Sequence, residues 1–496
     1  MGQNFWADTA KLSELPLLTG KKTADVAIVG AGITGLTTAY RLAEESKKVI
    51  VIEAGSLEQS ATAKSSAHLT TSSDYYYLKI VKEYGIETAR AVAGSRLAAL
   101  NFIAGMAKLF PCDFKYVPGY LYSEGRDNPL EDECRRASAA GLDVSLIDGQ
   151  KLPLPFKATT AVEFKDQAIF HPYKYLSGMA EFLNRSGLCE IYGNSRVISR
   201  NKNELSTLEG SVVADEIVYA THYPVFIDLH QTLAYPYRSY MISAIVEEDT
   251  GDSLYWDTAD PYRYTRSYRD GDKKYLLVGG ADHKTGHQTK DSYQELENYL
   301  RERYTVKKIT GRWSSQYYEP ADGLPYIGKS YSGSEYIATG FSGDGLIYGT
   351  LAGIAISDAI LNKEKKMWEE IYDAARMNIA GSAGKFVSEN IDVASDMIKD
   401  HFSTKDSGNE ENLQRGQGII IRKGGSDLAV SKDIKGRIRQ VSAVCPHMKC
   451  LVRWNHLDET WDCPCHGSRF TTAGKVITGP AVSDLKDIPS NKEAMK

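Results

Sequence analysis

Residues 25–55 read DVAIVGAGITGLTTAYRLAEESKKVIVIEAG, and this stretch decides the fold. An apolar run, Val26–Val29, has the length of a buried parallel strand, and the glycines that follow it have the spacing G-x-G-x-x-G. Gly30 permits a tight turn, Gly32 lets the backbone approach a pyrophosphate, and Gly35 lets the following helix pack on the strand. The stretch therefore predicts a strand, a glycine turn and a helix that together bind a dinucleotide.

The end of the same stretch supplies an acidic residue. A second apolar strand over Val49–Ile52 leads into Glu53, eighteen residues after Gly35. A carboxylate in this position accepts hydrogen bonds from a ribose hydroxyl. NAD and FAD are both bound by this kind of turn, so the motif by itself leaves the choice of dinucleotide open.

The composition is that of a globular protein with more than one domain. The chain has 496 residues, 42% hydrophobic and 25% charged, so two or three domains are expected. The net charge of −5 gives no reason to expect a nucleic-acid partner. No apolar run approaches the roughly twenty residues of a transmembrane segment, and the first residues lack an apolar signal core, so a cytoplasmic location is expected.

Other segments show the periodicities of helices and strands. A polar stretch of small residues, 60–73, is expected to be a cofactor loop, and the longer strands of 239–280 indicate a second, largely antiparallel sheet. Polar residues 377–412, with one amphipathic helix over 387–402, are expected to link two domains. Shorter elements are predicted as helices over 87–109, 134–140, 173–184 and 346–361, and as strands over 197–199, 205–208, 211–213 and 216–220.

Two glycine-rich blocks carry a resemblance to a known family. Asp322-Gly-Leu-Pro-x-Ile-Gly328 and Ala338-Thr-Gly-Phe-Ser-Gly-x-Gly345 resemble blocks of the D-amino-acid-oxidase-like (glycine/sarcosine oxidase) FAD-dependent oxidoreductases. The resemblance covers about residues 5–373 and implies that FAD is the dinucleotide. It also implies an α/β FAD-binding Rossmann-type domain interleaved with an antiparallel-sheet substrate domain.

The resemblance further implies domain boundaries and cofactor contacts. The oxidoreductase would comprise residues 1–376, with FAD-binding segments at about 20–80, 165–225 and 310–365 and substrate-domain segments at about 81–164 and 226–309. The flavin ring would lie between the loop 65–70 and the turn 343–346. The residues expected at FAD are Gly30, Gly32, Ile33, Thr34, Gly35, Glu53, Ala54, Ser65, Ser66, His68, Val197, Ala220, Thr221, Asp322, Gly340, Gly343, Asp344, Gly345 and Leu346.

Departures from the family pattern bear on how FAD is held. Some sarcosine oxidases carry a flavin-linking cysteine where this chain has Ser315 or Gln316, so that bond is unavailable. His68 lies in the loop where dimethylglycine-dehydrogenase-like relatives place a flavin-linking histidine. FAD is expected to be bound non-covalently.

A second cofactor site is indicated near the end of the chain. Cys445-Pro-His447 and Cys463-Pro-Cys465-His466 give the pattern C-x-H…C-x-x-H. This matches a Rieske 2Fe-2S site, in which two thiolates hold one iron and two imidazoles hold the other. Zinc is the structural alternative, because two cysteines and two histidines also suit a tetrahedral ion.

The sequence around these ligands, about 413–485, resembles Rieske ferredoxin-like domains, so an all-β Rieske domain is expected over 413–496. By the same resemblance, Cys450 and Cys465 would form the disulfide that joins the two ligand loops in the Rieske proteins of bc complexes. Where high-potential relatives have a tyrosine that donates to a ligand sulfur, this chain has Phe470.

Together these features predict a dehydrogenase that oxidises a C–N bond of an amine or amino-acid-like substrate. FAD accepts an electron pair and releases single electrons, which the cluster would pass to an external acceptor, a protein or a quinone. Two alternatives are a relay between proteins and a reductase that feeds an oxygenase; the absence of a second G-x-G-x-x-G unit argues against the reductase. Tyr264, Arg266 and Tyr348 are candidate catalytic residues, with the arginine expected to bind a substrate carboxylate.

The replacement Phe470→Tyr should raise the reduction potential of the cluster. The oxidised site is neutral and gains a negative charge on reduction, so a hydroxyl that donates to a ligand sulfur stabilises the reduced form. A charge-assisted hydrogen bond contributes roughly 1.5 to 3 kcal/mol, and only its difference between redox states counts, so a shift of tens of millivolts is expected. Protein-film voltammetry of both forms measures it. An unchanged or lower potential with an intact cluster would show that this side chain does not face the sulfur.

Overall fold

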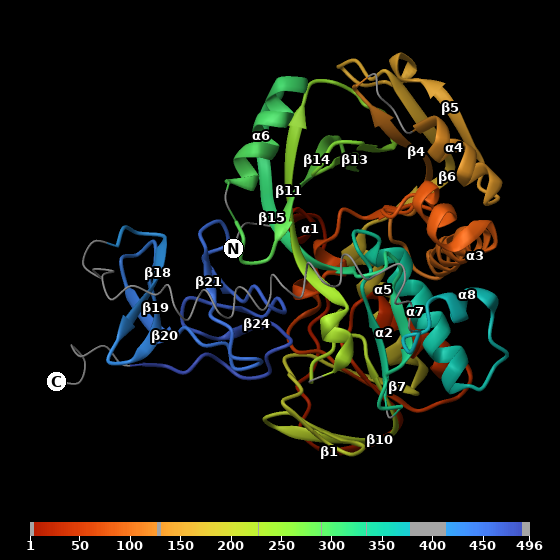
Figure 1. Ribbon diagram of the computed structural model, residues 1–496. Coiled ribbons are helices and arrows are strands. Elements are labelled where there is room, and N and C mark those ends of the chain that lie inside the picture. Colours follow the sequence, from red (N-terminus) through yellow and green to blue (C-terminus); the bar gives the residue numbers. More distant parts are fainter. Residues whose placement is uncertain are drawn as a thin grey trace.

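The computed structural model describes residues 4–125, 130–226, 228–288, 290–333, 335–376 and 413–488. The expected linker 377–412 and its helix lie outside these residues. The described chain contains two large sheets and a C-terminal part, residues 413–488, with two small sheets (Figure 1). Among the described helices, none is long and apolar enough to cross a membrane.

The first large sheet contains the strand, turn, helix and strand expected from residues 25–53. Its strands follow the order β16-β17-β10-β1-β2-β7, and β1 pairs in parallel with both β2 and β10. Helix α2 starts directly after the glycine turn and packs against α7. The elements are β1 (Gly20–Val29), α2 (Ile33–Glu44), β2 (Val49–Ile52), α5 (Pro172–Ser186), β7 (Cys189–Tyr192), β8 (Ser199–Asn201), β9 (Glu204–Ser206), β10 (Gly210–Tyr219), β16 (Tyr326–Lys329), β17 (Tyr336–Thr339) and α7 (Gly345–Ile360).

One part of this sheet differs from the expected pattern. The two strands predicted over 211–213 and 216–220 are a single strand, β10, and no strand occupies 197–199 in full. The strand is continuous because β10 pairs with β1 from Gly20↔Gly210 to Val29↔Tyr219. Pairing with a long neighbour therefore overrides the polar interruption at Asp215.

The second large sheet has nine strands and is mostly antiparallel, as expected for a substrate domain, with one parallel pair between β4 and β12. The elements are β3 (His68–Leu69), α3 (Tyr77–Met106), β4 (Lys115–Ser123), α4 (Leu130–Ala139), β5 (Val144–Asp148), β6 (Thr160–Ile169), β11 (Ala234–Val246), β12 (Leu254–Asp257), β13 (Arg263–Asp270), β14 (Lys273–Lys284), α6 (Ser292–Arg303) and β15 (Val306–Pro320). Two short helices, α1 (Phe5–Thr9) and α8 (Met367–Ile371), complete the oxidoreductase.

Two of the domain boundaries expected from the sequence fall inside strands of the second sheet. The boundary expected at 310 falls inside β15, which pairs with β11 along its whole length. The boundary at 165 falls inside β6, which pairs with β3 and β4. Strands of the second sheet run through both positions, so composition alone does not mark the change of domain.

The C-terminal part is all-β, as expected, and its strands are drawn in blue in Figure 1. Trp461 and Phe470 are fully buried in its core, which also contains Cys445 and Cys463. The strands are β18 (Gln417–Lys423), β19 (Ser426–Lys432), β20 (Ile438–Ser442), β21 (Arg453–Asn455), β22 (Thr460–Asp462), β23 (Arg469–Phe470) and β24 (Val476–Thr478).

A buried arginine joins α3 to the start of α7. The side chain of Arg96 is fully buried and donates to both carboxylate oxygens of Asp344, over 2.7 and 2.9 Å. It also donates to the carbonyl oxygens of Thr70 (3.0 Å) and Thr71 (3.1 Å). One side chain therefore fixes the loop after β3 against the glycine turn before α7.

The replacement Arg96→Ala should lower the free energy of unfolding by about 3 to 5 kcal/mol, because it leaves the carboxylate of Asp344 buried without its partner. Arg90→Ala is a matched control on the same helix, since Arg90 is exposed and pairs with exposed Glu87. The control should change stability by less than about 1 kcal/mol. Urea denaturation of the three holoproteins compares them, and equal losses in both variants would contradict the role given to Arg96.

Candidate functional site

A cavity of about 350 Å³ lies between the two large sheets and is also bounded by the C-terminal part. Most residues expected at FAD line it: Gly30, Gly32, Ile33, Thr34, Glu53, Ala54, Ser65, Ser66, His68, Val197, Ala220, Thr221, Gly343, Asp344, Gly345 and Leu346. These residues come from six separate segments of the chain. The fold therefore brings the segments singled out in the sequence to one place.

The glycine turn is built by close backbone contacts. Gly30 has φ +107°, and a Cβ there would lie 2.5 Å from the carbonyl oxygen of Ala220. A Cβ on Gly35 would lie 1.9 Å from the carbonyl oxygen of Gly30, so Gly35 lets α2 pack on the turn without lining the cavity itself. Larger residues cannot occupy either position without moving backbone.

Glu53 lies at the edge of the cavity with its carboxylate held by backbone. One oxygen accepts from the N–H of Ala31 over 2.8 Å, and the other accepts from the N–H of Gly55 over 3.1 Å. Each carboxylate oxygen retains acceptor capacity. The side chain is therefore oriented and still able to accept from a ribose hydroxyl.

Asp322 and Gly340 do not line the cavity, although both were expected at FAD. Asp322 is buried, and both of its oxygens accept from the guanidinium of Arg376, over 2.9 and 3.1 Å. Gly340 has φ +74° and lies against Pro320. Both residues lie in the stretch of chain around β16 and β17.

Two of the three candidate catalytic residues are also outside the cavity. The guanidinium of Arg266 is buried and donates to the carbonyl oxygen of Ala67 over 2.8 Å, so it is not free for a substrate carboxylate. Tyr348 is buried with its ring 4.9 Å from the guanidinium carbon of Arg96. Both side chains are packed in the protein interior and contact other protein groups.

Tyr264, the third candidate, does line the cavity. Its hydroxyl lies 3.0 Å from Oγ of Ser239, and its ring packs edge-on to His68 with 5.6 Å between centroids. Tyr262, Asp282 and Tyr317 line the same region, and sequence reasoning did not name them. The dense tyrosines of 239–280 were the available signal for Tyr262, but strand register was needed to show which of them face inward. Asp282 and Tyr317 lie outside that stretch.

His68 reaches the cavity from β3. Both ring nitrogens are buried without a hydrogen-bond partner. Burial, with a smaller contribution from Arg266, lowers the pKa of His68 to about 3, so the imidazole is neutral. A neutral, unpartnered imidazole beside the expected flavin position can accept or donate one hydrogen bond.

The four expected cluster ligands lie together in the C-terminal part. The rings of His447 and His466 have centroids 5.0 Å apart, and Cys445 and Cys463 are both buried in the adjoining core. Burial lowers the pKa of His447 to about 4 and that of His466 to about 3, so both rings are neutral. Hydrogen bonding from the Cys463 side chain lowers the pKa of Cys445 to about 7, although burial opposes this shift.

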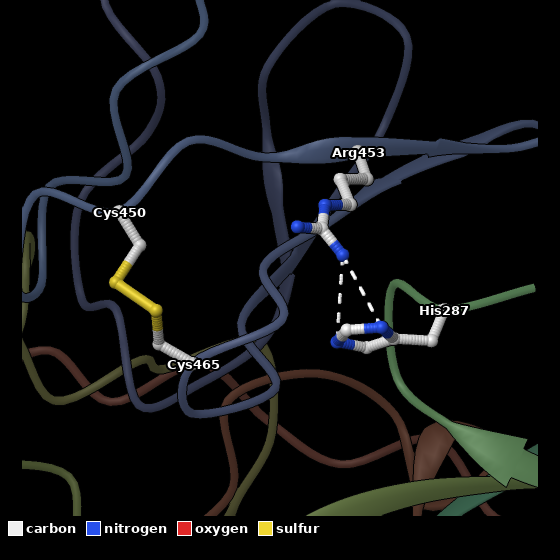
Figure 2. The surroundings of a disulfide bond; sticks show 4 residues. All are labelled: His287, Cys450, Arg453 and Cys465. Atoms are coloured by element: carbon white, nitrogen blue, oxygen red, sulfur yellow. Dashed lines mark hydrogen bonds between the residues drawn. A yellow bond between two sulfur atoms is a disulfide. The ribbon is translucent and has the colours of Figure 1, made fainter. Parts of the chain in front are cut away.

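This arrangement fits a Rieske cluster. Nε2 of His447 and Nδ1 of His466 are buried without hydrogen-bond partners. Two thiols and two neutral imidazoles with unpartnered nitrogens are the donor set that such a cluster takes. Cys450 and Cys465 form a disulfide between the two loops (Figure 2), so neither is available as a ligand.

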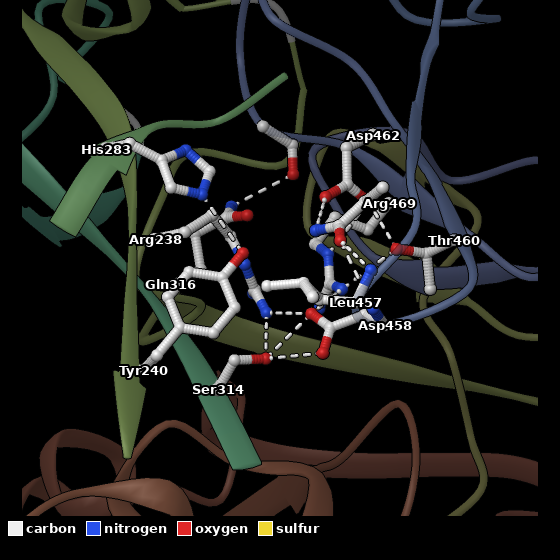
Figure 3. Close-up of polar contacts among 12 residues, drawn as sticks. Arg238, Tyr240, His283, Ser314, Gln316, Leu457, Asp458, Thr460, Asp462 and Arg469 are labelled. Carbon is white, nitrogen blue, oxygen red and sulfur yellow. Dashed lines mark hydrogen bonds and ion pairs between the residues drawn. The ribbon is translucent and has the colours of Figure 1, made fainter. Parts of the chain in front are cut away.

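The C-terminal part is attached to the oxidoreductase by a buried polar network (Figure 3). Arg238 of β11 forms an ion pair with Asp458, whose carboxylate also accepts from Ser314 (2.7 Å) and from Arg469 (2.7 Å). Burial raises the pKa of Asp458, but the two arginines outweigh it and the pKa falls to about 2. The carboxylate is therefore ionised between its two partners.

The loop that carries His466 lies directly against the oxidoreductase. Nε2 of Gln316 donates to the carbonyl oxygen of Gly467 over 2.9 Å, and Arg453 contacts His287 (Figure 2). Residues of the C-terminal part also form part of the cavity wall: Arg469, Ile477, Thr478, Gly479, Ala481 and Val482. The cluster loop and the cavity are therefore immediate neighbours.

Comparisons with known proteins agree with this architecture. The family model "FAD dependent oxidoreductase" (DAO) matches residues 25–359, and the model "Rieske [2Fe-2S] domain" matches residues 404–489. The Rieske 2Fe-2S iron-sulfur protein YhfW of Bacillus subtilis (strain 168) is 29% identical over 98% of this chain and 97% of its own length.

More distant relatives match the oxidoreductase alone. The gamma-glutamylputrescine oxidoreductase of Escherichia coli (strain K12) is 24% identical over 72% of this chain and 88% of its own length. The crystal structure of glycine oxidase from Geobacillus kaustophilus matches with a TM-score of 0.61 and 15% identity, over 72% of this chain and 99% of that one. The chain belongs to the DAO family of FAD-dependent oxidoreductases and carries a Rieske [2Fe-2S] domain at its C-terminal end.

Proposed function

We propose that the chain is a dehydrogenase that oxidises a C–N bond of an amine or amino-acid-like substrate and passes the electrons through its Rieske cluster to an external acceptor. The observation that carries this proposal is the shared wall: residues of the C-terminal part line the same cavity as the glycine turn. A cluster placed there can receive electrons within the chain. The external acceptor would be a protein or a quinone.

The proposed roles follow from the positions of the side chains. The glycine turn with Glu53 would hold the adenine half of FAD, and the turn at Gly343–Leu346 would meet the flavin ring. Cys445 and Cys463 would hold one iron, and His447 and His466 the other. FAD supplies the capacity to accept two electrons and release them singly.

Aromatic side chains bridge the cavity and the cluster loop. The ring of Tyr223 is stacked on Tyr318, with 4.4 Å between centroids, and lies 6.4 Å from the ring of His466. Both tyrosines line the cavity. Both rings are almost fully buried and lie between the cavity and the cluster loop, which supports direct electron transfer from the flavin to the cluster.

The cavity also favours an enzyme over a relay between proteins. Beyond the segments expected at FAD, it is lined by polar and aromatic side chains such as Tyr262, Tyr264 and Asp282. An electron relay needs no space for a small molecule beside its flavin. A lined cavity in that position is what substrate oxidation requires.

The purified holoprotein should contain about two irons per chain and no zinc, because the donor set is that of a Rieske cluster. It should also release its FAD on acid precipitation, because non-covalent binding is expected. Metal analysis and the flavin content of the supernatant measure both. One zinc without iron would refute the cluster, and flavin that stays with the precipitated chain would point to a bond at His68.

The replacement Asp458→Asn should slow electron transfer from flavin to cluster by tenfold or more. It leaves Arg238 and Arg469 buried without their shared carboxylate, which loosens the contact between the two parts. Flash photoreduction of the bound flavin, followed by the absorbance of the cluster, measures the rate without any substrate.

Asp487→Asn is the matched control, because Asp487 is exposed on the C-terminal part, whereas Asp458 is buried. The control should transfer electrons at the wild-type rate. If Asp458→Asn also does so with both cofactors bound, the docked arrangement is not the one that transfers electrons.

An anaerobic screen of amines and N-methyl amino acids tests the reaction itself. A true substrate should bleach the flavin first and then produce the electron paramagnetic resonance signal of the reduced cluster. In Cys445→Ser, which removes one iron ligand, the same substrate should still bleach the flavin, whereas reduction of added cytochrome c should be lost. Equal reduction of cytochrome c by both proteins would contradict the route through the cluster.

A further inference from the structure

One end of the cavity is lined by tyrosines and carboxylates from the substrate-domain sheet. Tyr262 precedes β13, Tyr264 lies on β13, and their rings have centroids 5.7 Å apart. On β14 and β15 of the same sheet, the hydroxyl of Tyr317 donates to Oδ2 of Asp282 over 3.1 Å. Tyr262, Tyr264, Tyr317 and Asp282 together form the tyrosine wall of the cavity.

This wall stands next to the turn expected at the flavin ring. A Cβ on Gly343 would lie 2.7 Å from the hydroxyl of Tyr262 and 2.5 Å from Oδ2 of Asp74. The N–H of Gly343 donates to that same oxygen of Asp74 over 2.7 Å. A molecule bound against the wall would therefore lie at the reactive end of the cavity.

Asp282 has an unsatisfied carboxylate oxygen. Its Oδ1 is buried and has no hydrogen-bond partner. Burial raises the pKa of Asp282 to about 6, while the hydroxyls of Ser239 and Tyr317 and the charge of Arg263 oppose this shift. An unpaired buried carboxylate is costly, and a cationic ligand would remove that cost.

Arg263, whose charge acts on Asp282, forms its own contacts elsewhere. One terminal nitrogen of Arg263 donates to the carbonyl oxygen of Pro261 over 2.6 Å, and the other lies 3.6 Å from Glu295. Glu319, a further neighbour, carries the same charge as Asp282 and raises its pKa. Arg263 therefore offsets the charge of Asp282 only from a distance, without a bond to it.

The cationic side chains of the cavity lie elsewhere. Among the described residues that line it, these are Lys64, Arg196, Arg238 and Arg469. Arg238 and Arg469 pair with Asp458, and Arg196 donates to the carbonyl oxygens of Val476 and Ile477. Burial, with the charges of Arg469 and Arg238, lowers the pKa of Lys64 to about 8, so it too lies near the C-terminal part. Among the described residues that line the cavity, no cationic side chain is paired with Asp282.

We propose that this wall binds the cationic nitrogen of the substrate, with Asp282 as its counter-charge and the rings of Tyr262, Tyr264 and Tyr317 around it. Aromatic faces attract ammonium groups, and methylated ammonium groups in particular. The substrate class is therefore an amine or methylated amine recognised through its positive charge, and no carboxylate is required. This proposal rests on the proposed oxidation of a C–N bond.

Two probes of similar size and opposite charge test the proposal on the wild-type holoprotein. Benzyltrimethylammonium is a cation that a flavin cannot dehydrogenate at nitrogen, and benzoate is an anion. Difference spectra of the bound flavin give a dissociation constant for each at constant ionic strength. The cation should bind at least tenfold more tightly than benzoate, and tighter binding of benzoate would overturn the proposal.

The replacement Asp282→Asn keeps the shape of the side chain and removes its charge. It should weaken binding of benzyltrimethylammonium by tenfold or more and leave benzoate unchanged or bound more tightly. Asp270→Asn is the matched control, because Asp270 is exposed at the end of β13. An unchanged affinity for the cation in Asp282→Asn would overturn the role of Asp282.

The probe-binding test can fail or succeed independently of the test of the proposed function. Probe binding needs no electron transfer, and flash photoreduction needs no substrate. If the cation binds through Asp282 but the cluster is not reduced by the flavin, only the route through the cluster fails. If the cluster is reduced but the anion binds better, only the proposed substrate class fails.

Discussion

The shared carboxylate of Asp458 is the contact on which the placement of the two cofactor sites depends. Arg238 comes from the long strand β11, and Arg469 comes from the strand that follows the cluster loop. Arg469 also pairs with buried Asp462 over 3.0 Å, so two arginines are balanced by two carboxylates. The loss of either arginine would leave an uncompensated charge in the interior. Because the guanidinium is planar and rigid, each ion pair fixes the direction of the carboxylate as well as its distance. The network therefore sets the orientation of the C-terminal part and not merely its attachment.

The register of two strands makes this contact possible. In the pairing of β11 with β15, Tyr240 lies opposite Ser314 and Arg238 lies opposite Gln316. Ser314 contacts Asp458 and Gln316 contacts Gly467, so one stretch of paired strands presents both contacts. A shift by one residue would turn these side chains to the opposite face. The geometry between the cofactor sites thus depends on two paired strands, β11 and β15, that contain neither the glycine turn nor the cluster motif.

Local patterns predicted the parts of the fold whose chemistry is local. The glycine turn, α2, β2 and the cluster motif depend on residues close together in the sequence, and their spacing reveals them. Tyr264 and Arg266 illustrate the limit, because they lie on the same strand two residues apart and so share a face. Only Tyr264 reaches the cavity, since the space beside Arg266 is occupied by the Ala67 loop and the ring of Trp6. Long-range packing of this kind cannot be read from the periodicity of the sequence. The roles of Asp458 and Asp282 could not be predicted for the same reason.

The shared wall of the cavity has a consequence for the biogenesis of the protein. Part of the enclosure around the cofactor pocket, from Ile477 to Val482, is supplied by the last strand of the C-terminal part and the loop after it. Undocking of the C-terminal part would uncover this side of the cofactor pocket. Loading of the dinucleotide and docking of the iron-sulfur module are therefore coupled steps in the assembly of the holoprotein.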